Sequence, residues 1–128
     1  MHHPWRPRHS MLQSETTVAP RDRQKLLHGT LDALILKTLS HGARHGYAIA
    51  RWLEEQTGDA IAVEEGSLYP ALYRLERKGL LRAEWGLSEL DRKAKFYHLT
   101  VLGHARLEAE TAEWARFSRA VTAVLKPG

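Results

Sequence analysis

Hydrophobic residues in the middle of the chain recur at the spacing of amphipathic helices. The first set follows Thr30, a candidate helix cap, at intervals of three and four residues: Leu31, Leu34, Ile35, Thr38 and Leu39. This spacing predicts a helix with one buried face that ends at Gly42. A second helix is expected over residues 46–57, because its apolar residues also share one face and a glycine follows it.

The stretch GSLYPALYRLERKGLL, residues 66–81, predicts a third helix with two different faces. Ser67 is expected to cap it, Pro70 to lie in its first turn, where a missing N–H costs little, and Gly79 to end it. The buried face is expected to carry Leu68, Leu72 and Leu75. The other positions either stay solvated or contact a partner, and they include Ser67, Tyr69, Tyr73, Arg74 and Arg77.

Two short segments after this helix predict a β-hairpin. Residues 80–86 alternate apolar and polar side chains, residues 94–100 are rich in aromatic side chains, and the polar segment 87–93 lies between them. Thr100 is then expected to cap a long helix over residues 101–125, about 37 Å in length at 1.5 Å per residue.

The order of these elements predicts a mainly α fold with a small β-hairpin. We expect a winged helix-turn-helix DNA-binding domain over residues 25–100 and a dimerisation helix over residues 101–128. Residues 1–24 contain three of the five prolines and no helical period, which predicts a flexible basic tail. The amine of Met1 and the ring of His3 could chelate copper or nickel there, but a basic arm without metal is the simpler interpretation.

Composition excludes several classes of function. The chain has no cysteine, which removes disulfides, thiol catalysis and cysteine-ligated zinc. The histidines are scattered along the chain and no nucleophile–base pair can be proposed from spacing, so we expect neither an enzyme nor a metal or other cofactor. Apolar runs fall short of the roughly 18 residues of a membrane span, and the N-terminus lacks a signal-peptide pattern. A cytoplasmic protein without a membrane partner is therefore expected.

The net charge of +4 is weak evidence for a nucleic-acid partner, because residues 1–25 hold +3 of it and the rest of the chain only +1. The positions of the charges are more informative. The hairpin carries cations beside a tyrosine, where a wing would contact phosphates: Arg92, Lys93, Lys95 and Tyr97. Glu89 and Asp91 dilute this cluster, so on its own it also fits a solvated surface.

The last helix carries apolar residues close to the spacing of a heptad seam, namely Leu107, Trp114, Phe117, Val121 and Val124. A helix this long has little of a small domain left to cover. Its apolar stripe is therefore expected to meet a second copy of the chain, as suits a reader of palindromic DNA. The alternative is a helix that folds back on its own domain.

Several motifs together resemble the PadR family of transcriptional regulators. They are GTLDALILKTL, HGYAIARWLE, GSLYPALYRLERKGLL, RKAKFYHLT and EWARFSRAV, in the family's order. The likeness runs from about Leu26 to Leu125 and is greatest to short members with one C-terminal helix, the subgroup often labelled acidobacterial-type. It implies a winged-helix homodimer that binds an inverted-repeat operator and usually represses transcription.

The resemblance also implies roles for individual residues. The recognition surface would comprise Ser67, Tyr69, Pro70 and Arg74, and the wing contacts would be Lys93, Lys95 and Tyr97. Tyr47, in the HGY motif, falls near the DNA-facing helices, although packing explains it equally well. Some short members bind planar aromatic compounds against a tryptophan of the last helix, and Trp114 is the matching residue, with simple interface packing as the alternative.

One feature departs from this pattern. Glu64 and Glu65 precede the third helix, where they suit the positive end of a helix but would repel nearby phosphates. They keep open a second hypothesis, a winged-helix module that binds proteins or small molecules without an operator. Our main expectation is a dimeric DNA-binding repressor in which the third helix reads bases and the wing contacts phosphates.

Overall fold

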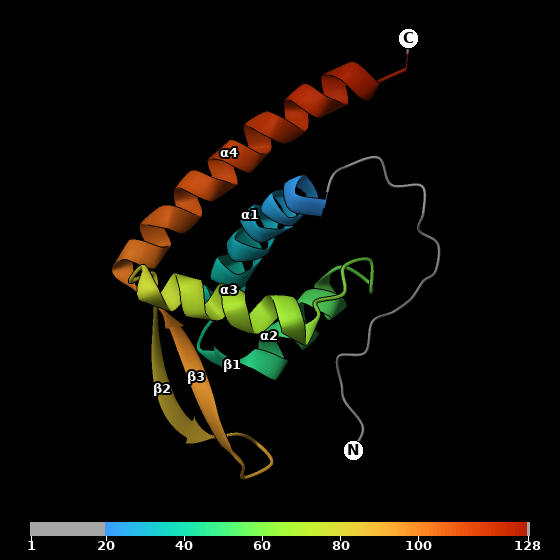
Figure 1. The fold of residues 1–128 in the computed structure, drawn as a ribbon. Coiled ribbons are helices and arrows are strands. Elements are labelled where there is room, and N and C mark those ends of the chain that lie inside the picture. The colour runs from blue at the N-terminus through green and yellow to red at the C-terminus, as the bar shows by residue number, and fades with distance from the viewer. Residues whose placement is uncertain (1–19, 128) are drawn as a thin grey trace.

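The computed structural model describes the backbone of residues 20–127 and the side chains of residues 29–127. Within these residues the chain forms four helices and a small antiparallel sheet (Figure 1). The elements in chain order are α1 (Pro20–Leu39), β1 (Arg44–His45), α2 (Gly46–Gln56), α3 (Glu65–Arg77), β2 (Leu81–Leu87), β3 (Lys93–Leu99) and α4 (Val101–Leu125). The mainly α winged helix-turn-helix fold predicted from the sequence is confirmed.

The start of α1 corrects two expectations. The helix begins at Pro20, ten residues before Thr30, so Thr30 lies inside the helix and does not cap it. The last five residues of the expected 1–24 tail are therefore helical. Proline suits the first position of a helix because its fixed φ is already helical and its missing N–H would have no partner there. The suggested metal site at Met1 and His3 lies outside the described residues.

The start of α3 also differs from the prediction. Its N-cap is Glu64, in extended backbone, and the Glu64 carbonyl oxygen accepts the N–H groups of Ser67 and Leu68 at 3.0 and 2.9 Å. Ser67 therefore occupies the first turn and is not the cap. Pro70 becomes the sixth residue of the helix, so it cannot donate to the carbonyl of Gly66. The helix continues past it because the following N–H groups are still available.

The end of α3 follows the prediction, since the helix stops at Arg77 and Gly79 adopts a left-handed φ of 77°. The N–H of Leu80 donates to the carbonyl of Leu75 at 3.0 Å, and the N–H of Gly79 to that of Glu76 at 2.9 Å. These two bonds define a Schellman motif, and the buried Leu75 and Leu80 provide its usual apolar contact. The motif turns the chain directly into β2.

The core lies where α1, α2 and α3 meet the base of the sheet. It consists of Ile35, Leu36, Leu39, Ile49, Ala50, Leu53, Val63, Leu68, Ala71, Leu72, Leu75, Leu80, Leu81 and Tyr97. The predicted leucine face of α3 is confirmed, with Leu68, Leu72 and Leu75 at most 1% exposed. Fully burying such side chains contributes about 1.5–3 kcal/mol each, which fixes the rotation of α3 and so decides which residues face outward.

The sheet contains a third strand that the sequence did not reveal. Its order is β1-β3-β2, and β1 pairs Arg44 with Tyr97 and His45 with Phe96. A two-residue strand is too short to produce an alternating pattern. The predicted hairpin is present as β2 and β3, each displaced by one residue from the expected bounds. We call β2, β3 and the residues 88–92 that join them the wing.

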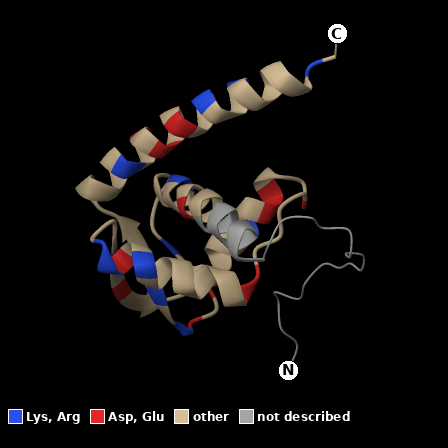
Figure 2. Cartoon of the chain, turned by 45° about the horizontal axis from the view of Figure 1, so that its top comes forward, with Lys and Arg blue, Asp and Glu red and all other residues tan. Residues whose placement is uncertain are grey.

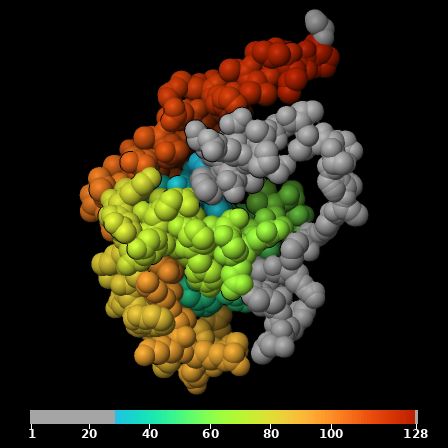
Figure 3. All heavy atoms as spheres, in the orientation of Figure 1, coloured from blue at the N-terminus to red at the C-terminus, as the bar shows by residue number. Residues whose placement is uncertain are grey.

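The predicted long helix is confirmed as α4, capped by Thr100, whose hydroxyl oxygen accepts the N–H of Gly103 at 3.0 Å. Gly103 alone is buried among the residues of α4, all of which the structure describes. A Cβ at Gly103 would overlap the Leu80 carbonyl oxygen and lie 2.6 Å from Leu99 Cδ1. The far end of α4 extends away from the wing and is highly exposed (Figures 1 and 3). None of the described helices is long and apolar enough to cross a membrane.

Candidate nucleic-acid interface

The outer face of α3 presents a continuous row of exposed side chains. Burial of the leucines turns outward the positions that lie four residues apart, Glu65, Tyr69, Tyr73 and Arg77, together with Pro70. The Tyr73 hydroxyl accepts a hydrogen bond from the Arg77 guanidinium at 3.2 Å, and this guanidinium lies 5.6 Å from the Tyr73 ring centroid. The pair presents a planar donor beside an aromatic ring, which is an arrangement able to bind guanine edges or phosphates.

Arg74 does not share this face. Its guanidinium donates to Asp32 of α1 at 2.8 Å, and both side chains are partly buried. The pair ties α3 to α1, so the guanidinium that the resemblance assigned to recognition is held against α1, to one side of the exposed row. Ser67 is exposed in the first turn of α3.

The HGY motif positions α3 against α2. The Nδ1 atom of His45 accepts the N–H of Ala48 at 3.2 Å and so caps α2. A Cβ at Gly46 would lie 2.7 Å from the Tyr69 hydroxyl, so the absence of a side chain lets the Tyr69 ring rest on the start of α2. Tyr47 is 41% exposed at the same end of α2. Burial against this surface raises the pKa of Tyr69, with Glu65 adding to the rise.

The wing carries its cations at different depths. Arg92 is exposed at the tip and Lys93 is exposed on β3, with its Nζ 5.6 Å from the ring centroid of Trp85. The Nζ of Lys95 lies 3.5 Å from Glu76 of α3 and 5.8 Å from the centroid of Tyr97. These contacts hold both lysines on the face of the wing that looks toward α3.

Tyr97 lies on the same face, farther from the tip of the wing and next to the core. Its side chain is only 5% exposed and belongs to the core, so its predicted role as a surface contact of the wing does not match its position. Burial raises the pKa of the Tyr97 phenol above its ordinary value of 10.0, and Glu76 and Tyr69 add to the rise.

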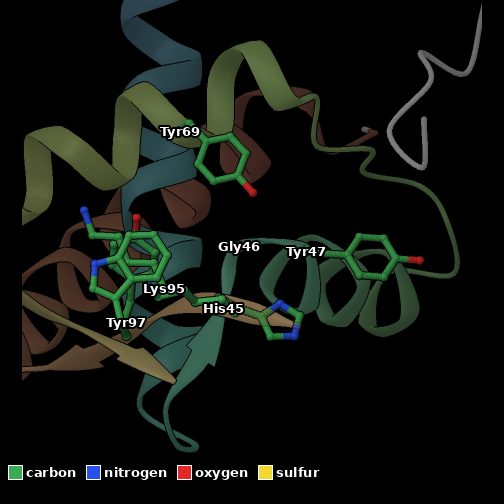
Figure 4. Close-up of a pocket in the computed structure, with 9 residues that line it drawn as sticks. His45, Gly46, Tyr47, Tyr69, Lys95 and Tyr97 are labelled. Carbon is green, nitrogen blue, oxygen red and sulfur yellow. The ribbon is translucent and has the colours of Figure 1, made fainter. Parts of the chain in front are cut away.

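A groove of about 440 Å³ separates α3 and the start of α2 from the wing. It is lined by His45, Gly46, Tyr47, Tyr69, Trp85, Lys93, Ala94, Lys95 and Tyr97. In Figure 4, Tyr69 descends from α3 toward Gly46, Lys95 and Tyr97 lie on the wing side, and Tyr47 points away from the centre. The groove therefore combines aromatic walls with two ammonium groups, and it opens beside the exposed row of α3.

Acidic residues surround this region as well. Figure 2 shows both basic and acidic residues on α3 and the wing. Glu64 and Glu65 are exposed at the start of α3, as the sequence suggested. At the tip of the wing, Glu89 lies 3.7 Å from His45 Nε2, and a backbone hydrogen bond, followed by the nearby His45, lowers the pKa of Glu89. Binding of a polyanion here depends on where the cations lie and not on the net charge.

A second groove, of about 960 Å³, lies between α1 and α4. Leu107, Trp114 and Phe117 line it from α4, and the rings of Trp114 and Phe117 lie 5.9 Å apart. The outer part of the predicted seam is exposed within one chain: 56% for Trp114, 53% for Phe117, 38% for Val121 and 82% for Val124. A single chain therefore leaves most of this apolar stripe uncovered.

Comparison with known proteins decides the family. The model of the "Transcriptional regulator PadR-like family" matches residues 35–109. An uncharacterized protein of Lysinibacillus sphaericus is 33% identical over 93 residues, which cover 73% of this chain and 85% of that protein. The chain belongs to the PadR-like family of transcriptional regulators. This family consists of regulators and not of enzymes.

Solved structures of transcriptional regulators have a similar fold. A PadR-like transcriptional regulator from Bacillus cereus superposes with a TM-score of 0.69 at 31% identity, over 81% of this chain and 99% of that one. A transcriptional regulator from Clostridium thermocellum gives a TM-score of 0.72 at 25% identity, over 80% and 99% of the two chains.

In this PadR-like chain the sequence missed three positions that shape the interface. Trp85 was read as part of a strand, but it lines the groove. Asp32 and Glu76 were not singled out, although they hold Arg74 and Lys95. The distance of 42 positions between Asp32 and Arg74 leaves no local pattern that could have revealed the pair. Among the described residues, no cluster of three or more His, Asp or Glu side chains could hold a metal ion.

Proposed function

We propose that the protein is a sequence-specific DNA-binding repressor that binds an inverted-repeat operator as a homodimer. The observation that carries this proposal is the exposed row on α3 beside the lysine-bearing face of the wing. The leucine face of α3 packs into the core, so the helix is rigidly held while its outer face remains available. A rigid helix flanked by cations matches the needs of major-groove recognition, where bases are read and phosphates are neutralised.

The exposed side chains of α3 would contact the bases, beginning with those near its C-terminal end. Arg77, stacked on Tyr73, offers a guanidinium that can bind guanine through two hydrogen bonds. Ser67, Tyr69 and Pro70 would complete the surface toward the start of the helix. Arg74 would position the helix without contacting a base, because its ion pair with Asp32 sets the distance between α3 and α1. Tyr47 would lie at the edge of this surface.

The wing would contact the DNA backbone through Arg92, Lys93 and Lys95. Tyr97 would support Lys95 from the core, since the ammonium lies over its ring. Phosphate contacts of this kind supply affinity without sequence information, and each one makes binding more sensitive to salt. Glu76 competes for Lys95, which leaves Lys93 as the more available of the two lysines.

Dimerisation would use the apolar stripe of α4, which consists of Leu107, Trp114, Phe117, Val121 and Val124. The last four are exposed, whereas Leu107 is partly buried against the core of its own chain. A second copy would cover these apolar side chains and place two α3 helices on successive half-sites. A planar aromatic effector could then bind beside Trp114, which lines the groove between α1 and α4 together with Leu107 and Phe117. Such a ligand would alter the angle between the two α4 helices and so shift the population of DNA-binding dimers.

The proposal is tested by titrating the protein onto DNA from upstream of its own gene, and onto random DNA of equal length, at several salt concentrations. Binding should be tighter to the upstream DNA. The variant Lys93→Ala/Lys95→Ala should weaken binding to both duplexes similarly and lower the salt dependence by about two counterions per bound chain. The control variant Lys37→Ala/Lys126→Ala removes the same charge from α1 and the end of α4 and should leave the slope unchanged.

Equal salt slopes for the wing variant and the unmodified protein would contradict the wing assignment. Equal affinity for upstream and random DNA at physiological salt would instead favour a module that binds proteins or small molecules. The exposure of Glu64 and Glu65 supports this alternative, because carboxylates at the start of α3 repel phosphates. Light scattering of the unmodified protein and of Phe117→Glu tests the dimer, since a charge in the stripe should yield monomers.

A further inference from the structure

Trp85 is a large apolar side chain that the fold does not use in its core. It is 62% exposed on β2, although tryptophan is among the side chains that gain most from burial. The register pairs Trp85 with Lys95 and the next outward position, Leu87, with Lys93. Cross-strand partners share one face of a sheet, so Trp85 lies on the same face of the wing as both lysines.

The surroundings of Trp85 suit a phosphodiester chain. The indole lines the groove on the wing side, Tyr69 lines it on the α3 side, and Lys93 and Lys95 bring two ammonium groups to the same groove. The Lys93 ammonium is stacked at 5.6 Å from the indole centroid, which holds the charge next to the apolar wall. Alternation of an apolar surface with cations complements alternation of sugars with phosphates. The groove is also open and continuous with α3, which favours a polymer over a small ligand.

We infer that Trp85 is a DNA contact, whose indole packs on a deoxyribose of the strand that lies in the groove between α3 and the wing. Lys93 and Lys95 then meet the phosphates on either side of that sugar. The indole is amphipathic, so its ring can cover the apolar faces of the sugar while its N–H remains able to donate to a phosphate oxygen. This inference rests on the proposed function, because it requires that α3 and the wing face DNA.

The contact makes a specific prediction for affinity. Trp85→Ala should weaken binding about tenfold, within the range measured for aromatic contacts with single-stranded nucleic acid. Because the sugar is the same at every position, the factor should be equal for upstream and random duplexes. The salt slope should stay unchanged, since the substitution removes no charge. Trp85→Phe should retain most of the affinity because a ring remains.

Leu87→Ala provides the matched control. Leu87 is 66% exposed on the same strand and the same face, but it does not line the groove. Its removal should leave affinity unchanged. If Leu87→Ala and Trp85→Ala weaken binding equally, the effect is a general one on the wing and the inference is overturned. A loss confined to the upstream duplex would also overturn it, because that result would indicate base reading.

A spectroscopic measurement separates this inference from the proposed function. The chain holds four tryptophans, and fluorotryptophan labelling gives each a fluorine NMR signal, with that of Trp85 identified by its loss in Trp85→Phe. Addition of either duplex should shift the Trp85 signal and protect it from a soluble paramagnetic quencher. DNA binding without any change at Trp85 would refute the inference and leave the proposed function intact. Absence of DNA binding altogether would refute both.

Discussion

The contact between Gly46 and Tyr69 allows a quantitative test of how α2 and α3 are fitted together. In Gly46→Ala the new Cβ would lie 2.7 Å from the Tyr69 hydroxyl oxygen and 2.9 Å from Cε1 and Cζ of the ring. Distances below 3.0 Å are not tolerated by real Cβ atoms, so one of the two groups must move. The ring will move, because it is the outer end of a side chain with two free torsions and is 41% exposed.

Two opposing effects set the size of the change. Alanine is favoured over glycine in a helix by up to about 1 kcal/mol. Displacing Tyr69 from its preferred rotamer costs about 0.5–1.5 kcal/mol. In the unmodified background Gly46→Ala should therefore change the free energy of unfolding by less than about 1 kcal/mol. In a Tyr69→Ala background the clash is absent, so the same substitution should stabilise the fold, and the coupling between the two sites should be about 1 kcal/mol.

Urea denaturation followed by circular dichroism measures all four proteins of this cycle. The chain concentration must be kept constant, because dimerisation would add a concentration-dependent contribution to stability. A coupling of about 1 kcal/mol corresponds to a shift of about 0.5 M in the urea midpoint for a slope of about 2 kcal/mol per molar. Gly29→Ala is the control, since a Cβ there has no neighbour within 4 Å. Equal effects of Gly46→Ala in both backgrounds would refute the reasoning.

Three further predictions follow from contacts within the domain. Arg74→Ala and Asp32→Ala should each lower the free energy of unfolding by about 1 kcal/mol, and the double variant should lose little more, as urea midpoints would reveal; additive losses would contradict a direct pair. Gly103→Ala should destabilise by about 1–3 kcal/mol or more in the same assay, because its Cβ would meet the Leu80 backbone carbonyl as well as the Leu99 side chain, and the backbone cannot rotate away; unchanged stability would show that α4 packs less closely on Leu80. Burial raises the pKa of Tyr97, so the folded state retains this proton to higher pH than the unfolded state, and stability should fall as the pH rises above about 10. Tyr97→Phe should flatten this alkaline loss in melts recorded across that range, and an identical pH profile would refute the assignment.

The sequence predicted the elements of this fold well because each depends on local periodicity. The leucines of α3 repeat at helical spacing, so its buried face could be identified without any tertiary information. Helix starts were less predictable, because Thr30 and Ser67 are good capping residues by type, yet the preceding backbone was already helical in both cases. A good capping residue in the sequence does not exclude a helix that begins before it.

Side-chain direction within the site was the harder problem. Arg74 and Arg77 are identical in type and three positions apart, but only Arg77 lies on the outer row, whereas Arg74 lies on the side of α3 where Asp32 of a distant helix binds it. Tyr69 and Tyr97 differ in the same way, since one is partly exposed and the other belongs to the core. Trp85 was not singled out from the sequence, because its exposure on β2 depends on which parts of the domain cover that strand. In each case the outcome depends on contacts far apart in the sequence.

The close packing at Gly103 gives α4 the properties of a lever. Its buried pivot lies near the N-terminal end, and about 22 residues extend beyond it, a distance of about 33 Å at 1.5 Å per residue. A rotation of about 10° at the pivot would therefore move the far end by about 6 Å. Gly103, which has no room for a methyl group, thus sets the direction of α4. A small change in atomic volume at this position would move the C-terminal end of α4 by several ångströms.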